Sequence, residues 1–272
     1  GIFDLDAAQG HGVLFGFPVS REQRTSAHTM PEGGLVSTAK DMAQYLVAQL
    51  NSGTYADRRV LSAEGIAAMQ RPETPGAPPG EGYGMGWIIE PWPGTHVVRH
   101  GGSLENFRAF AWLLPAHDTG FVVLINQNGF VPAMLAYSEI PAGIAARLTG
   151  SEPERGLSMR VFYGGATAVF LLVAVLDVRW WLRAIRRKTA PEGSRVGRLV
   201  PVIGGFLRAG AFYALPYGLL AAMDRGFSWD LGWAMAPTVV LFIGWNVVMG
   251  AAKGVARIRM LMRSKDQGSL VE

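Results

Sequence analysis

The sequence contains no cysteine, so disulfide bonds and thiolate metal sites are excluded, and the redox compartment stays open. Several short catalytic motifs are also missing: Gly-x-Ser-x-Gly, the phosphate-binding P-loop and His-Glu-x-x-His. The five histidines are not spaced as a metal cluster, and we expect neither a metal nor a cofactor. The first residue is Gly1, and neither an initiator methionine nor a signal peptide is present. We expect the chain to be the C-terminal piece of a longer protein.

The net charge of +4 conceals two different regions. Residues 1–150 contain 9 Lys and Arg against 13 Asp and Glu, and glycine and proline interrupt them often, as in a water-soluble domain. Residues 151–272 contain 16 Lys and Arg against 8 Asp and Glu, and their basic clusters separate long apolar runs. Basic clusters beside apolar runs are typical of membrane topology. We therefore expect a lipid bilayer as a partner and no nucleic acid.

Two helices are predicted in the first hundred residues, and each follows a hydroxyl side chain that can cap it. The first begins near Ala39, after Ser37 or Thr38, and carries apolar residues at the spacing of an amphipathic helix. The second spans Ala63–Gln70, after Ser62.

Residues 1–30 show no clear periodicity and are predicted to be irregular. Strand-like runs follow the two helices: Gly84–Glu90, Thr95–Arg99 continuing after two glycines into Phe107–Leu114, and Gly120–Asn126. Their short connections favour an antiparallel meander, and a helix over 134–148 can cover one face of the sheet. This α+β core is thin, and one sheet edge would lie open. The open edge is a second indication that an N-terminal half is missing.

Ser37-Thr38-Ala39-Lys40 matches Ser-x-x-K, in which a helical lysine one turn later can accept the serine proton. We do not assign Ser37 as a nucleophile. The pattern is short, Ser37 has a simpler role as a helix cap, and neither Tyr-x-Asn nor Ser-x-Asn follows at a plausible distance.

The segment Val97-Val98-Arg99-His100-Gly101-Gly102-Ser103-Leu104 organises the soluble region. A β-branched run ends in an imidazole, two residues without side chains and a hydroxyl. By itself the pattern fits a hairpin end with an exposed histidine. It also fits one wall of an active site, because the glycines let another backbone approach and the histidine titrates near neutral pH.

Four segments, taken in order, resemble the class C β-lactamase-like serine hydrolases, a group that includes penicillin-binding-protein-like peptidases and esterases. The segments are Pro31–Ala43, Tyr83-Gly84-Met85-Gly86-Trp87, His100-Gly101-Gly102-Ser103 with Asn106-Phe107, and Val122–Asn128. The resemblance implies the C-terminal part of a β-lactamase/transpeptidase-like fold. It also implies acyl transfer through a serine ester, on an ester, a D-amino-acid peptide of the peptidoglycan type or a lactam.

The same resemblance implies roles for four residues. His100 would polarise or hydrogen-bond the substrate, Gly101 and Gly102 would let substrate lie along the strand, and the Ser103 N–H would donate to the oxyanion. Lactamases usually carry Lys-Thr-Gly here, so His100 removes a permanent cation that would attract a substrate carboxylate. The nucleophilic serine, the lysine and the tyrosine of the family's first two motifs are absent, and we expect them upstream.

The second region is predicted to be an all-α membrane domain. A linker, 151–160, leads to three transmembrane helices at about 161–182, 199–223 and 231–252, and a basic tail follows at 253–272. Arginine and lysine gather between the first two spans and after the third. The positive-inside rule therefore places the C-terminus in the cytoplasm and the hydrolase portion of this multi-pass cell-membrane protein outside.

Two polar residues stand within the predicted spans. Arg208 is expected either to pair with Asp177 or to extend its charge toward the interface, and Asn246 is expected to bond between helices. Two other functions stay open. One is a non-catalytic membrane protein that binds peptidoglycan or a partner, and the other is a transporter or sensor that uses Arg208.

Overall fold

The computed structural model describes residues 7–22, 30–74, 78–129, 132–133, 136–154, 156, 158–186, 195–221, 232 and 236–268. Contacts divide the described residues into two compact units. The first comprises residues up to Val13 together with Pro18–Met159, and the second comprises Leu14–Phe17 together with the residues from Arg160 onward.

The first unit is built on a five-stranded antiparallel sheet with the strand order β5-β6-β7-β8-β9. Its strands are β5 (Gly82–Tyr83), β6 (Ile88–Trp92), β7 (Thr95–Ser103), β8 (Arg108–Leu114) and β9 (Thr119–Ile125). Each strand neighbours the next one along the chain, as the short connections predict. Among the described strands β9 has a neighbour on one side only, and one sheet edge is therefore open, as expected.

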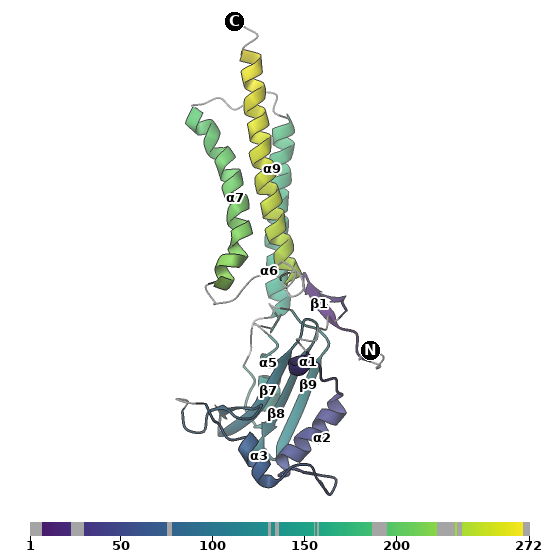
Figure 1. Ribbon diagram of the computed structural model, residues 1–272. Helices are drawn as coiled ribbons and strands as arrows, with labels where there is room; N and C mark the ends of the chain where they lie inside the picture. The colour runs from purple at the N-terminus through teal and green to yellow at the C-terminus, as the bar shows by residue number, and fades with distance from the viewer. Residues whose placement is uncertain are drawn as a thin grey trace. The chain divides into compact units, whose positions relative to one another are not determined.

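Helices cover both faces of this sheet (Figure 1). One face packs against α2 (Ala39–Leu50) and α3 (Ala63–Met69), with Leu46 and Leu113 almost fully buried. The other face packs against α5 (Glu139–Leu148). Side chains of β8 alternate between the two cores, because successive residues of a strand point to opposite faces. The predicted α+β class is confirmed.

Both predicted helix caps are confirmed. Thr38 precedes α2, and its hydroxyl accepts a hydrogen bond from the Asp41 N–H at 3.1 Å. Ser62 precedes α3 and accepts from the Gly65 N–H at 3.0 Å. In each case a side-chain oxygen satisfies a first-turn N–H that has no partner within the helix.

The prediction that residues 1–30 are irregular is wrong in part. Strands β1 (His11–Leu14) and β2 (Phe17–Ser20) form a hairpin, and α1 (Met30–Gly33) is one helical turn. The hairpin escapes a periodicity argument because its strands are four residues long. The hairpin is hydrogen-bonded to a segment far away in the sequence, because the His11 N–H donates to the Asn126 carbonyl at 2.9 Å. A second small hairpin joins β3 (Thr54–Tyr55) and β4 (Arg58–Arg59).

The predicted strand runs need two corrections. Of the run Gly84–Glu90, only residues 88–90 are strand, as the start of β6, because the chain turns at 84–87 after β5. The run through the glycines does not continue into 107–114. Instead β7 includes both glycines and ends at Ser103, and the chain reverses where the Leu104 N–H donates to the Phe107 carbonyl at 3.0 Å. The predicted helix over 134–148 is shorter in the structure: α5 begins at Glu139 after a turn at 136–138, and residues 134–135 lie outside the described ones.

The second unit contains three long helices: α6 (Met159–Arg186), α7 (Arg195–Ala221) and α9 (Pro237–Gly268). Within the described residues α6 and the Pro237–Met262 part of α9 are long and apolar enough to cross a membrane. The apolar stretch of α7, Leu199–Leu215, is shorter than that criterion requires. Helix α9 continues to Gly268, through most of the segment predicted as a basic tail, and the start of the third predicted span lies partly outside the described residues.

Close glycine packing joins α7 to α9. A Cβ atom added to Gly205 would lie 2.8 Å from the Gly250 carbonyl oxygen, and one added to Gly250 would lie 2.7 Å from the Gly205 oxygen. Real Cβ atoms do not approach backbone this closely, so both positions require glycine. Glycines at such positions let two helix backbones approach closely.

The predicted pairing of Arg208 with Asp177 is confirmed. The guanidinium of Arg208 donates two hydrogen bonds to the Asp177 carboxylate, at 3.1 and 3.2 Å, and thereby joins α7 to α6. It also donates to Asn246 of α9 at 3.0 Å, so Asn246 bonds between helices as expected.

Candidate active site

The end of β7 has one open edge. Its partner β8 runs beside it from Val98 to Ser103, whereas β6 pairs with it only as far as Arg99. From His100 onward, no described strand borders the other edge of β7. Every second residue of a strand directs its N–H and C=O to the same edge, so this segment offers free backbone groups to an extended ligand.

His100 stands at the beginning of this open edge. Its side chain is exposed, and its Nε2 lies 3.2 Å from the Tyr83 hydroxyl. The two rings also meet edge to face, with centroids 6.1 Å apart. Tyr83 therefore orients the imidazole through one ring nitrogen, and no residue in the described part of the chain hydrogen-bonds the other, Nδ1.

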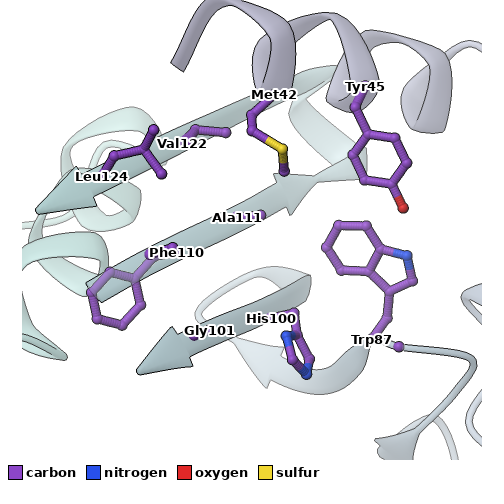
Figure 2. A pocket seen from close by; sticks show the side chains of 12 residues that line it. Met42, Tyr45, Trp87, His100, Gly101, Phe110, Ala111, Val122 and Leu124 are labelled. Carbon is purple, nitrogen blue, oxygen red and sulfur yellow. The ribbon is translucent and has the colours of Figure 1, made fainter. Parts of the chain in front are cut away.

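A cleft of about 270 Å³ opens beside His100 on the face of the sheet that also carries α2 (Figure 2). Figure 2 shows Met42 and Tyr45 extending from α2 toward the strands, with Trp87 beside Tyr45. The rings of Tyr45 and Trp87 are stacked, with centroids 6.2 Å apart. The lining comprises Met42, Tyr45, Gly86, Trp87, His100, Gly101, Gly102, Ala109, Phe110, Ala111, Val122 and Leu124.

Small residues create this cleft. In the strand register Gly102 lies opposite Ala109, which lies opposite Leu124, and His100 lies opposite Ala111. Farther along the same face larger side chains fill the equivalent positions and pack under α2. The face is therefore filled at one end and hollow at the end where His100 stands.

The two glycines are not required by the fold. A Cβ added to Gly102 would lie 3.7 Å from the Ala109 Cβ, and one added to Gly101 would lie 3.4 Å from the Phe110 ring. Both distances are ordinary van der Waals contacts, and neither residue has a positive φ angle. Since neighbours would tolerate a side chain at both positions, the glycines keep the open edge accessible rather than relieve a clash.

Ser103 ends the strand and is held by a buried amide. The Asn128 side-chain nitrogen donates to the Ser103 hydroxyl at 3.0 Å and also to the Leu104 carbonyl. Asn128 is fully buried, and its own N–H donates to the His11 carbonyl at 3.0 Å. This network fixes the backbone where the resemblance implies an oxyanion donor.

The cleft is electrically almost neutral. Its lining includes no Asp, Glu, Lys or Arg. Burial raises the pKa of the Tyr45 phenol above its usual value, although a hydrogen bond with Gln49 lowers it slightly. The described residues contain no group of three or more His, Asp or Glu side chains placed to hold a metal ion. The arrangement fits an uncharged, apolar part of a substrate.

Three of the four predicted site residues line the cleft: His100, Gly101 and Gly102. Ser103 adjoins it on the same strand. Their predicted roles stay predictions. Sequence reasoning assigned no site role to Tyr83, Trp87 or Asn128, although all three lie in segments that carry the family resemblance.

The Ser-x-x-K match does not contribute to the cleft. Ser37 and Lys40 are exposed and absent from its lining, and Thr38, rather than Ser37, caps the helix.

Three comparisons with known proteins bear on this site. Residues 4–140 match the family described as Beta-lactamase. "Protein flp" of Staphylococcus aureus (strain NCTC 8325 / PS 47) is 26% identical over 132 residues, which are 48% of this chain and 25% of that protein. "Putative beta-lactamase-like 1" of Homo sapiens is 30% identical over 128 residues, 45% of this chain and 25% of that protein.

A solved structure, the octameric penicillin-binding protein homologue from Pyrococcus abyssi, is 30% identical, with a TM-score of 0.44 over 58% of this chain and 34% of that one. The residues matched in the curated relatives span about a quarter of the length of those proteins. The family match covers just over half of the 272 residues and includes the whole cleft. The chain therefore belongs to the beta-lactamase family, whose members are usually serine hydrolases.

Proposed function

We propose that this chain is the C-terminal part of a membrane-anchored serine hydrolase of the class C β-lactamase-like group. It would act through a serine acyl-enzyme on an ester, a D-amino-acid peptide or a lactam outside the cytoplasm. The observation that carries this proposal is the open edge of β7, with His100 and two sterically unnecessary glycines beside an apolar cleft.

In this proposal the acyl part of the substrate lies along β7 and its apolar portion enters the cleft against Trp87. His100, oriented by Tyr83, hydrogen-bonds the substrate, and the Ser103 N–H donates to the oxyanion. One such donor is worth about 3–4 kcal/mol of transition-state stabilisation in acyl-transfer enzymes. The nucleophilic serine, its lysine and a tyrosine would come from the upstream part of the protein.

The upstream coding sequence provides the first test. It should contain Ser-x-x-K followed by Tyr-x-Asn, and a start codon directly before Gly1 would overturn the proposal.

The second test uses the full-length protein and two serine-directed probes, a fluorophosphonate and a fluorescent penicillin. We expect one serine to be labelled, and we expect His100→Ala to slow labelling by about a hundredfold to a thousandfold, the range for one lost polar transition-state contact. His96→Ala is the matched control, because His96 is also exposed on β7 and does not line the cleft. Absence of any serine labelling would favour a non-catalytic binding protein.

The membrane part of the proposal places three spans in a cell membrane, with residues 187–194 and the C-terminus in the cytoplasm. The 28 residues of α6 extend about 42 Å, more than the hydrocarbon thickness of about 30 Å. Only 11% of its most apolar stretch is buried, unlike a core helix of a soluble protein. Reporter fusions at residues 190 and 272 should both report the cytoplasm, and an external position for either would overturn this topology.

A further inference from the structure

Cations outnumber anions inside the three-helix unit. Arg208, Lys253 and Arg257 all lie partly or largely covered between the helices. Asp177 is the one acidic residue in α6, in α7 and in α9 up to Met262. These helix segments therefore contain one carboxylate for these three cations.

The single carboxylate is fully used. Asp177 is almost completely buried, and it accepts two hydrogen bonds from Arg208, one from Lys253 and one from the Trp245 indole at 2.9 Å. These donors occupy both of its oxygens. Since one negative charge offsets one positive charge, the described residues leave the equivalent of two of these cations uncompensated.

The uncompensated charge lies at one aromatic ring. The Lys253 ammonium is 5.2 Å from the centre of the Trp180 ring, and the Arg257 guanidinium carbon is 5.0 Å from it. Arg257 also donates to the Pro201 carbonyl, and no described carboxylate pairs with it. Lys253 and Arg257 are four residues apart on α9, so they share one face of that helix.

Helix lengths indicate the depth of this cluster. Arg257 is 20 residues beyond the start of α9, or about 30 Å along it, and Trp180 is 21 residues beyond the start of α6, or about 32 Å. These lengths match a hydrocarbon core of about 30 Å. If the helices span as proposed, the cluster lies at the cytoplasmic boundary, at the level of lipid phosphates.

We propose that Lys253 and Arg257, beside Trp180, bind the phosphate of an acidic lipid headgroup in the cytoplasmic leaflet. Buried charges in proteins are paired, and a phosphate offers several acceptor oxygens for the free N–H groups of a guanidinium and an ammonium. Basic pockets between helices on this side of a membrane bind anionic headgroups in the same way. The inference rests on the proposed membrane location and is independent of the proposed hydrolase activity.

The test measures lipid binding to the full-length, detergent-extracted protein by native mass spectrometry. Phosphatidylglycerol is titrated against phosphatidylcholine with the same acyl chains, and inorganic phosphate forms a third arm. We expect phosphatidylglycerol to bind the wild type, and Arg257→Gln to weaken that binding by about tenfold, as for the loss of one hydrogen bond between charged groups. Phosphatidylcholine should bind both proteins weakly and equally.

Arg259→Gln is the matched control, because it removes the same charge from an exposed side chain two residues away. Equal weakening by both substitutions would show general surface attraction and overturn the site. A third outcome is that inorganic phosphate binds saturably and is lost in Arg257→Gln, while phosphatidylglycerol is not preferred over phosphatidylcholine. This outcome would show a site for free phosphate and would overturn the lipid headgroup as the ligand.

Two readouts separate this inference from the proposed function. A protein found in the soluble fraction without detergent would overturn both the membrane location and the lipid site. A detergent-requiring protein whose Arg257→Gln variant binds phosphatidylglycerol as well as the wild type does would overturn the lipid site alone. Serine labelling stays unaffected in either case.

Discussion

Gly102 can be used to test whether the missing side chain serves the fold or the proposed substrate. Its added Cβ would meet only an ordinary contact, at 3.7 Å, and its φ angle is not positive. Gly102→Ala should therefore leave the free energy of unfolding unchanged or raise it by up to about 1 kcal/mol. It should slow serine labelling of the full-length protein at least about tenfold, because the methyl group would block an approaching backbone.

Gly94 provides the contrasting control for this prediction. Its φ angle of 76° lies in the left-handed region, so Gly94→Ala should lower stability by about 1 kcal/mol and leave labelling unchanged. Chemical denaturation and the labelling rate, measured on both variants, check the pair. Normal labelling of Gly102→Ala would contradict a substrate lying along β7.

Tyr137 should make stability fall at alkaline pH. It is buried against β8, and burial raises the pKa of its phenol, an effect that Arg108 partly offsets. The folded state therefore holds the proton more tightly than the unfolded state, in which tyrosine titrates at a pH of about 10. The resulting stability is fully present below that pH and is lost as the pH rises toward the folded pKa.

The measurement is the urea midpoint at a series of pH values from about 8 to 11. Tyr137→Phe should flatten the alkaline decline relative to the wild type. Tyr55→Phe serves as the control, because Tyr55 lies in the small β3–β4 hairpin, outside both cores of the sheet. Parallel declines in all three proteins would show that Tyr137 does not account for the effect.

At the scale of elements, the contact between α7 and α9 depends on single glycines. Gly250→Ala would place a methyl group 2.7 Å from the Gly205 carbonyl oxygen, so the helices must separate. Overpacking of this kind costs about 1–3 kcal/mol. Gly244→Ala, on the same helix, would meet nothing within 4 Å and should be neutral or slightly stabilising. Thermal unfolding in detergent compares the two, and equal behaviour would argue against a close α7–α9 contact.

Elements were predictable from the sequence where their cause is local. Thr38 and Ser62 each precede an amphipathic run, and a cap together with a helical period identifies a helix without knowledge of the rest of the chain. The β1–β2 hairpin was missed because its supports are distant: the His11 N–H bonds to residue 126. The reversal after Ser103 was missed because the apolar run at Phe107–Leu114 resembles a continuation of the same strand, whereas it forms the next strand of the sheet.

The candidate site was predictable in part for the same reason. His100 and its glycines are consecutive, so they stand out in the sequence. The Tyr83 hydroxyl meets His100 across 17 residues, and the cleft combines residues of three neighbouring strands. Only strand register brings these groups together, and neither composition nor spacing encodes it. The Arg208–Asp177 pair was predictable because a charge within an apolar helix requires a partner and the sequence offers very few.

For the whole molecule, the unpartnered side of β9 has a consequence for solution behaviour. Its seven residues, Thr119–Ile125, include no charged residue and no proline. Charged side chains and proline are the usual protection of an edge strand against edge-to-edge association. Residues 1–158 produced alone should therefore form dimers or larger aggregates through this strand. Leu124→Lys, at an exposed side chain of β9, should shift them toward monomer in light scattering, whereas Val60→Lys, on an exposed side chain away from β9, should not. A monomeric wild-type fragment would contradict association through β9. If the fragment does associate, a soluble version made for crystallisation needs a charged residue on this strand.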